Sequence, residues 1–205
     1  ESPYRDINQL EAGSYLSCSG HRIRVQRYWN LRQQDDFHLS EAELGEQYHE
    51  LLLDAVELRL NAATSNAFTL SGGLDSSSVL SCAHAITKQP QPAYSAIYTD
   101  KTFDESDEIR PMLVEKVSEW RSIALGNKID LFSDIDELIA IHNEPIATAT
   151  WLSHLQICKA VSEEGYSQLF GGLGGDELNA GEYEYFIFHF ADLARTAPDA
   201  LLASE

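Results

Sequence analysis

The sequence is poor in positive charge. It contains 14 lysine and arginine residues against 33 aspartate and glutamate residues, for a formal net charge of −19. The deficit begins after residue 40, because residues 41–205 carry 28 acids and nine bases, whereas the first 40 residues carry five of each. A surface this acidic repels the phosphates of nucleic acids and of anionic lipids. We therefore expect neither nucleic acid nor a membrane surface as a partner.

Cysteines and long apolar runs are also scarce. The three cysteines, Cys18, Cys82 and Cys158, are far apart and form no Cys-x-x-Cys pattern, which argues against a disulfide framework or a zinc site. No apolar run approaches the roughly 20 residues that a membrane-spanning helix needs, and no segment has the pattern of a signal peptide. These absences predict a cytoplasmic protein.

Residues 68–78 have the pattern of a strand, a tight loop and the start of a helix. A short apolar run ends at Leu70, Ser71-Gly72-Gly73 follows, and apolar residues then recur at helical spacing as far as Ile86. The two glycines permit a sharp turn and a close approach of the backbone to a ligand, and the first amides of a helix attract anions. The backbone amides of Ser71, Gly72 and Gly73 are therefore predicted to face phosphate.

Asp75 suggests how the charge of that phosphate is neutralised. The loop lacks the Gly-Lys-Ser/Thr ending of common nucleoside triphosphatases, and residues 60–87 contain no lysine or arginine. A carboxylate beside a pyrophosphate needs a divalent cation between them, and Mg²⁺ takes a few carboxylates together with phosphate oxygens. Ser76 and Ser77 are predicted to donate hydroxyl groups to phosphate or to cap the helix. The alternative is an ordinary loop in which Asp75 and the serines have only capping roles.

A second glycine-rich loop, residues 171–178, follows an apolar segment near the carboxyl end of the chain. Its four glycines allow the backbone to lie against a planar ligand, and Asp176 and Glu177 follow them directly. We expect Asp176 to place a second carboxylate near the phosphate site. The alternative is a flexible turn in which Asp176 is a helix N-cap.

The order of elements predicts an α/β fold with a three-layer parallel sheet. In such sheets ligands gather at the carboxyl ends of the strands, where both glycine-rich loops fall. Residues 15–29 have the pattern of a β-hairpin, which is not stable alone and must pack on something else. The expected helices are 40–63, 76–87, a helix through Met112, Val114, Val117 and Trp120, then 134–141 and 152–164. The expected strands are a short one before the first loop, 93–98, a weak one at 128–132, and 166–170.

Several of these segments resemble one known family. Ser71–Ser78 is very similar to the pyrophosphate loop of the N-type ATP pyrophosphatases, and residues 171–183 resemble the second signature of the glutamine-hydrolysing asparagine synthetases. Residues 4–29 resemble the end of the glutaminase domain of those enzymes. Phe103–Ser106 matches a short element of theirs, although acids at a helix start are also favoured by the helix dipole. The resemblance implies an ATP pyrophosphatase fold for residues 36–205, truncated at its carboxyl end, and a glutaminase-like tail and linker for residues 1–35.

The same resemblance implies an ATP-dependent amide-forming ligase. The carboxylate of aspartate or of another small acid would attack the α-phosphorus of ATP, and ammonia from glutamine would displace AMP from the acyl adenylate. ATP and Mg²⁺ are the implied cofactors, with Asp75 and Asp176 as metal ligands. The implied catalytic residues are Asp75, Asp176 and Glu177. The implied nucleotide site consists of Leu70 and Ile97 on the adenine side, together with Ser71, Gly72, Gly73, Asp75, Ser76, Ser77, Gly171 and Gly172.

Three departures from the family pattern keep other interpretations open. Leu173 stands where asparagine-forming members have a glutamate, no amino-terminal cysteine nucleophile supplies ammonia, and the lysine that contacts the reacting phosphates is missing. We therefore expect this segment alone to bind nucleotide without turnover. The alternatives are a nucleotide-binding module without catalysis, or another ATP pyrophosphatase such as an NAD or GMP synthetase. The aromatic residues of 183–190 predict a core or subunit contact, and hence self-association as a homodimer.

Overall fold

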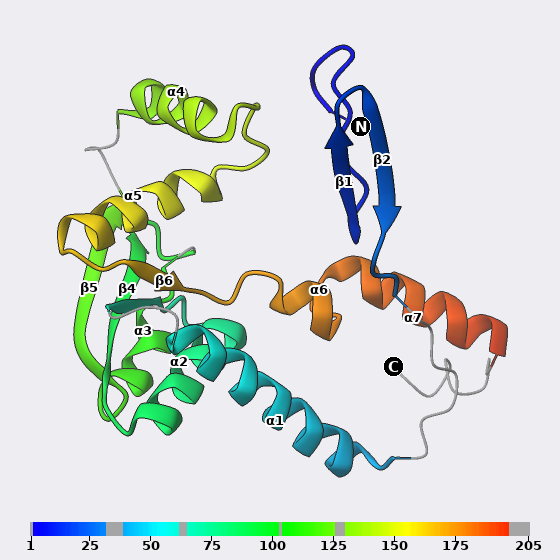
Figure 1. The fold of residues 1–205 in the computed structure, drawn as a ribbon. Helices are drawn as coiled ribbons and strands as arrows, with labels where there is room; N and C mark the ends of the chain where they lie inside the picture. The colour runs from blue at the N-terminus through cyan, green and yellow to red at the C-terminus, as the bar shows by residue number, and fades with distance from the viewer. Residues whose placement is uncertain (1, 32–38, 62–64, 103, 126–129, 197–205) are drawn as a thin grey trace.

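The centre of the molecule is a parallel sheet of four strands. The computed structural model describes residues 2–31, 39–61, 65–102, 104–125 and 130–196. Within these ranges the sheet has the order β5-β4-β3-β6 (Figure 1). All of its neighbouring strands are parallel. The strands are β3 (Asn66–Thr69), β4 (Gln91–Tyr98), β5 (Val117–Leu125) and β6 (Gln168–Phe170). The predicted α/β fold with a parallel sheet is confirmed.

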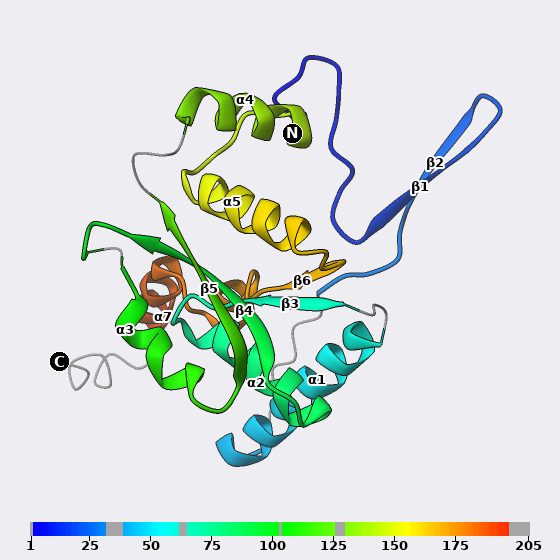
Figure 2. The same cartoon turned by 90° about the vertical axis from the view of Figure 1, so that its left-hand side faces the viewer.

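Helices cover both faces of this sheet, which gives the predicted three layers. One face carries α1 (Glu41–Leu60), α2 (Leu74–Thr87) and α3 (Ser106–Ile109), which continues into the 3-10 helix η1 (Arg110–Leu113). The opposite face carries α5 (Thr150–Glu163), and α4 (Leu131–His142) packs on α5 from outside (Figure 2). Within the described ranges, no helix combines the length and the apolar character that a bilayer crossing requires.

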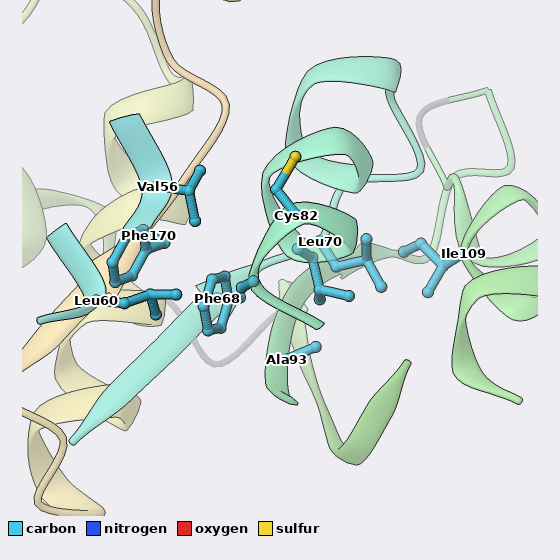
Figure 3. Packing of buried hydrophobic residues seen from close by; sticks show 10 residues of the cluster. Val56, Leu60, Phe68, Leu70, Cys82, Ala93, Ile109 and Phe170 are labelled. Atoms are coloured by element: carbon cyan, nitrogen blue, oxygen red, sulfur yellow. The ribbon is translucent and has the colours of Figure 1, made fainter. Parts of the chain in front are cut away.

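The core follows from the alternation of side chains along β3 and β4. Phe68 and Ala93 point toward α1 and α2, whereas their neighbours Ala67 and Tyr94 point toward α5. The rings of Phe68 and Phe170 stack with centroids 4.8 Å apart, which joins β3 to β6 at the point where both strands end (Figure 3). This packing fixes the two strands that lead into the glycine-rich loops.

The first long helix begins where the sequence predicts. Ser40 is the N-cap of α1, its hydroxyl accepts from the Glu43 amide, and the Glu43 carboxylate accepts from the Ser40 amide at 2.7 Å. This reciprocal capping box lowers the pKa of Glu43, because the hydrogen bonds from Ser40 favour the ionised carboxylate. Helix α1 then buries Val56 and Leu60 against the sheet.

The helix predicted through Val117 and Trp120 is wrong. Helical structure ends at Leu113, and Val117–Leu125 forms β5 at the edge of the sheet. Its register with β4 shifts between Gln91 and Pro92, which pair with Val117 and Glu119. Because of this irregularity, Val117 and Trp120 both contact the same core cluster although they are three residues apart. A spacing of three between core residues is typical of a helix, which explains the wrong prediction.

The prediction of a weak strand at 128–132 is also wrong for the residues of this segment that the structure describes. Leu131 and Phe132 begin helix α4, for which Asp130 is the N-cap, while residues 128 and 129 lie outside the described ranges. The helices predicted at 134–141 and 152–164 are confirmed as α4 and α5. The third strand of the sheet is therefore β5 and not 128–132.

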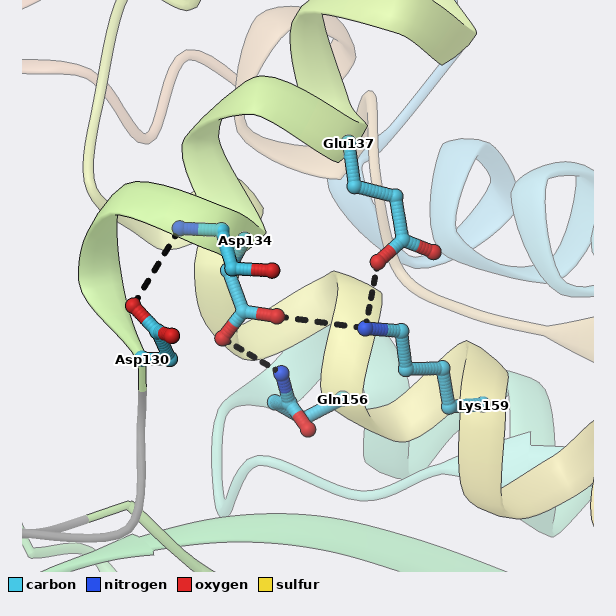
Figure 4. A network of polar contacts seen from close by, with 6 residues as sticks. Asp130, Asp134, Glu137, Gln156 and Lys159 are labelled. Carbon is cyan, nitrogen blue, oxygen red and sulfur yellow. Dashed lines mark hydrogen bonds and ion pairs between the residues drawn. The ribbon is translucent and has the colours of Figure 1, made fainter.

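An ion pair between a buried aspartate and a partly exposed lysine joins α4 to α5. Asp134 is 7% exposed, and its carboxylate accepts from Lys159 Nζ at 3.1 Å and from Gln156 Nε2 at 3.0 Å. Lys159 also pairs with Glu137 at 2.7 Å (Figure 4). Because both oxygens of Asp134 have donors, the charge is compensated inside the helix pair.

Two elements stand apart from the three layers. The predicted hairpin is confirmed as β1 (Ser14–Ser19) and β2 (Arg22–Arg27), and its residues are nearly all exposed. Helix α7 (Tyr183–Thr196) extends away from the sheet, with Tyr183, Phe186, Ile187, Phe188 and Phe190 exposed (Figure 1). The predicted self-association through this surface stays a prediction.

Candidate functional site

The two glycine-rich loops leave the sheet side by side. Strands β3 and β6 are parallel neighbours, with Phe68 opposite Phe170. The hydroxyl of Thr69 donates to the carbonyl of Phe170 at 3.3 Å. A Cβ placed on Gly171 would lie 3.0 Å from Thr69 Oγ1, so glycine permits this close approach. The predicted meeting of both loops at one sheet edge is confirmed.

The serines of the first loop hold the turn itself. Ser76 is only 5% exposed, its Oγ accepts from the Ser71 amide at 3.1 Å, and it donates to the Gly73 carbonyl at 3.3 Å. Ser77 Oγ also donates to the Gly73 carbonyl, at 2.8 Å. The N-cap of α2 is Gly73, and no side chain caps the helix. The capping role predicted for Ser76 and Ser77 is therefore wrong, and both serines stabilise the loop from inside.

Gly72 is the residue that makes the turn possible. Its φ is +79°, a conformation that residues with a Cβ rarely adopt. A Cβ on Gly72 would also lie 2.9 Å from the Cβ of Glu108 and 3.3 Å from the carbonyl oxygen of Glu105. The first loop is thus held against α3 and the residue that precedes it.

Asp75 lies against the second loop. It is half-buried in the first turn of α2. A Cβ on Gly175 would lie 2.1 Å from Asp75 Cγ, and one on Gly172 would lie 2.7 Å from Asp75 Cβ. The Asp75 carboxylate therefore occupies the space that a side chain at position 175 would need. The next residue along the chain is Asp176.

Asp176 belongs to the short helix α6 (Gly175–Asn179) and is exposed. Its carboxylate lies close to Gly181, where a Cβ would be 2.1 Å from Asp176 Oδ1. Glu177 is exposed in the same turn, and its carbonyl accepts from the Tyr185 hydroxyl at 3.0 Å. The second loop thus carries two exposed acidic residues directly after Gly175, the residue that packs against the half-buried Asp75.

The carboxylates of Asp75 and Asp176 fit a cation that takes its other ligands from the substrate. Among the residues that the structure describes, no cluster of three or more histidine, cysteine, aspartate or glutamate side chains forms a metal site by itself. Mg²⁺ is commonly held by one or two carboxylates together with phosphate oxygens and water. Asp75 and Asp176 match that requirement in number and in chemistry.

Glu105 and Glu108 lie against the first loop, and the sequence prediction did not include them among the candidate site residues. A Cβ on Gly72 would lie 2.9 Å from Glu108 Cβ and 3.4 Å from Glu105 Cβ. Burial raises the pKa of the Glu105 carboxyl, and the nearby Glu108 carboxylate raises it further. The signal was the Phe103–Ser106 motif, which contains Glu105. Phe103 itself lies outside the described ranges, and Glu108 is beyond the motif.

The two residues expected on the adenine side differ in their surroundings. Leu70 is 1% exposed and packs in the core beneath the loop. Its amide donates to the Tyr94 carbonyl at 2.9 Å, and its carbonyl accepts from the Ser95 hydroxyl. Ile97 is half-buried near the end of β4. Leu70 thus fixes the end of β3, while Ile97 retains an accessible side chain.

A family model described as Asparagine synthase matches residues 47–203, which is most of the chain and includes both glycine-rich loops.

Three curated relatives are similar over nearly the same region. Amidase chry2 of Gibberella zeae is 27% identical over 200 residues, covering 89% of this chain and 30% of the relative. Amidase chyE of Penicillium rubens is 27% identical over 204 residues, with the same two coverages. The putative asparagine synthetase (glutamine-hydrolyzing) 2 of Methanocaldococcus jannaschii is 25% identical over 202 residues, covering 98% of this chain and 39% of the relative. The chain thus spans about a third of the length of these relatives.

Two solved structures align with parts of the chain. An NMN synthetase from Francisella tularensis aligns with a TM-score of 0.39 at 14% identity, covering 60% of this chain and 52% of that one. An NH3-dependent NAD synthetase from Campylobacter jejuni aligns with a TM-score of 0.41 at 14% identity, covering 78% of this chain and 87% of that one.

Proposed function

The chain belongs to the asparagine synthase family, and on that premise we propose that its two glycine-rich loops bind Mg-ATP and activate the carboxylate of a small acid. The observation that carries the proposal is the contact of the Asp75 carboxylate with Gly175, one residue before Asp176. This contact brings the segment after β3, which contains Asp75, against the segment after β6, which contains Asp176. The product of the whole reaction would be an amide.

The first loop is proposed as the phosphate side of the site. The amides of Gly72 and Gly73 lie in a turn that Ser71, Ser76 and Ser77 hold in place. Such a preformed turn at the start of a helix favours an anion, because the helix dipole and the first amides of the helix point toward it. The Gly73 amide also donates to Ser71 Oγ at 3.4 Å, which holds it inside the turn. We assign Gly171 and Gly172 to the nucleotide site as well, since they lie beside Thr69 and Asp75. Ile97 is assigned to the adenine side.

Asp75 and Asp176 are the proposed ligands of Mg²⁺, with Glu177 beside them. The bound ion would neutralise phosphate charge next to these carboxylates. Without a cation, a pyrophosphate here would lie near the acidic residues Asp75, Asp176, Glu105 and Glu108. The acidity of the site is therefore a reason to expect metal-dependent binding.

The proposed chemistry has two steps. A carboxylate oxygen of the acid attacks the α-phosphorus of ATP, and the bond from that phosphorus to pyrophosphate breaks. Ammonia then attacks the acyl carbon, AMP leaves, and the nitrogen loses a proton. The contribution of this chain is the placement of the reactants and the stabilisation of phosphate charge.

The proposed source of ammonia is a glutaminase-like domain of the whole protein. Residues 1–35 are proposed as the tail of a glutaminase-like domain with its linker, and residues 36–205 as the synthetase part. The exposed hairpin β1–β2 supports that division, because two strands alone do not form a stable unit. Release of ammonia from glutamine is thus a property proposed for the whole protein.

The test is calorimetric titration of ATP with and without Mg²⁺. Wild-type protein should bind ATP only when Mg²⁺ is present, and Asp75→Asn should weaken that binding by about tenfold or more, the size of one lost charge-assisted contact. Asp54→Asn, which removes the same charge from the exposed face of α1, is the matched control and should bind normally. Absence of ATP binding by a folded wild-type chain would refute the proposal.

A second measurement separates a ligase from a module that only binds nucleotide. Exchange of labelled pyrophosphate into ATP in the presence of an acid requires formation of an acyl adenylate. A ligase shows this exchange, and a binding module does not.

A further inference from the structure

Two large apolar side chains are exposed at the contact between the loops. Leu74 is 82% exposed and immediately precedes Asp75, and Leu173 is 82% exposed and immediately follows Gly172. Gly172 itself packs against Asp75 and the backbone of Ser76. Each leucine therefore lies one residue from the point where the loops meet. Single exposed leucines are ordinary on protein surfaces, but these two are the sequence neighbours of Asp75 and Gly172, which pack against each other.

Basic side chains are lacking in the segments that form these loops. Residues 60–87 and 160–194 contain no lysine or arginine. On the α3 side, the flanking cations are Lys101, exposed in the turn after β4, and Arg110, which pairs with Asp107 at 3.2 Å. The acids, by contrast, gather at the loops as Asp75, Asp176, Glu177, Glu105 and Glu108.

This distribution of charge restricts the acid that the site can accept. The negative charge of the reacting carboxylate can be neutralised through the metal. A second carboxylate on the same substrate would find acids, leucines, serines and glycines on these loops, and no basic side chain. Placing a charge against apolar side chains without a partner is unfavourable. Burying an apolar group against the same leucines is favourable.

We infer, on the basis of the proposed function, that the acid activated here carries an apolar group in place of a second charge, and that Leu74 and Leu173 contact that group. The two leucines are specificity-determining residues for the acid. They do not contact the phosphates in this assignment, because the amides of the first loop and the two aspartates serve that part of the site.

The experiment compares acids on the nucleotide-loaded protein. The chain is saturated with Mg²⁺ and α,β-methylene-ATP, which cannot be cleaved at the reacting bond, and titrated with hexanoate, 3-phenylpropanoate and aspartate. We expect both apolar acids to bind at least about tenfold more tightly than aspartate, the size of effect that a few methylene groups in a pocket produce. Leu173→Glu should remove this preference. Leu58→Glu, at a 64% exposed leucine of α1, is the matched control and should retain it.

Each outcome is informative. Equal or tighter binding of aspartate, binding of no acid by protein that holds the nucleotide, or an unchanged preference in Leu173→Glu overturns the inference and leaves the proposed nucleotide site intact. Failure to bind α,β-methylene-ATP at all refutes the proposed function, and the inference with it.

Discussion

The hydroxyl of Ser95 donates a hydrogen bond to the carbonyl of Leu70, the last residue before the first glycine-rich loop. The same oxygen accepts from the indole Nε1 of Trp120 at 2.9 Å. Ser95 belongs to β4, Trp120 to β5, and Leu70 directly follows β3. One buried hydroxyl therefore connects β4 and β5 to the end of β3, where the loop begins.

Ser95→Ala should destabilise the protein by about 1–3 kcal/mol, because it leaves the buried Leu70 carbonyl and the Trp120 indole without a partner. Urea unfolding measures this change. Ser122→Ala is the matched control, since Ser122 pairs with Ser95 in the register of β4 and β5 but is exposed. It should change the free energy of unfolding by no more than about 0.5 kcal/mol. Equal effects of the two substitutions would show that the Ser95 hydroxyl has no special role.

Gly175→Ala tests the contact between the loops. The new methyl group would overlap the carboxylate of Asp75, so either that carboxylate or the second loop must move. We expect the affinity for Mg-ATP to fall by about tenfold, since an ångström of misplacement in a site has effects of at least this size.

Gly45→Ala is the control for that substitution. Gly45 lies within α1 and has no atoms near the position of an added Cβ. Alanine there should stabilise the helix by up to about 1 kcal/mol and leave nucleotide binding unchanged. Normal Mg-ATP affinity in Gly175→Ala would contradict the assigned position of Asp75.

Lys159→Met should destabilise the pair of helices α4 and α5. It leaves the buried Asp134 carboxylate with Gln156 as its remaining side-chain donor. A cost of about 1–3 kcal/mol is expected for the uncompensated acceptor, measured by urea unfolding. Adding Asp134→Asn to the variant removes the uncompensated charge and should recover part of the loss. A double variant that is less stable than Lys159→Met would contradict this account.

His154 predicts a specific dependence of stability on pH. Its ring lies 5.9 Å from the ring of Trp151, which in turn lies 5.0 Å from that of His142. Burial lowers the pKa of His154 below its ordinary value of 6.5, and the charge of His142 lowers it further. The unfolded chain therefore takes up a proton first as the pH falls. The stability from neutral His154 is complete above about pH 6.5 and is lost as the pH falls toward the lowered pKa.

The measurement is the free energy of unfolding between pH 8 and pH 5, expressed as the difference between wild type and His154→Gln. The variant should lose stability less steeply below pH 6.5, the range in which an ordinary histidine titrates. His49→Gln, on the exposed face of α1, should follow the wild-type profile. Parallel profiles for wild type and His154→Gln would rule out this contribution.

The chain alone determined the features that depend on neighbouring residues. The start of the first long helix at Ser40, the turn at Gly72 with the helix after it, and the position of both loops at strand ends are all local, and the structure confirms them. Turn and cap preferences arise from the backbone and side chains of a few consecutive residues, so they are present in the sequence itself.

Tertiary structure decided what depends on partners distant in sequence. Val117 and Trp120 have helical spacing, yet pairing with β4 makes them a strand, because the ladder hydrogen bonds and the irregular register at Gln91 outweigh a weak local preference. Asp75 meets Gly175, and Glu108 meets Gly72, only because parallel pairing and packing bring four separate segments to one edge of the sheet. Local sequence specifies which residues can turn, cap or carry charge, whereas nonlocal packing specifies which of them come together.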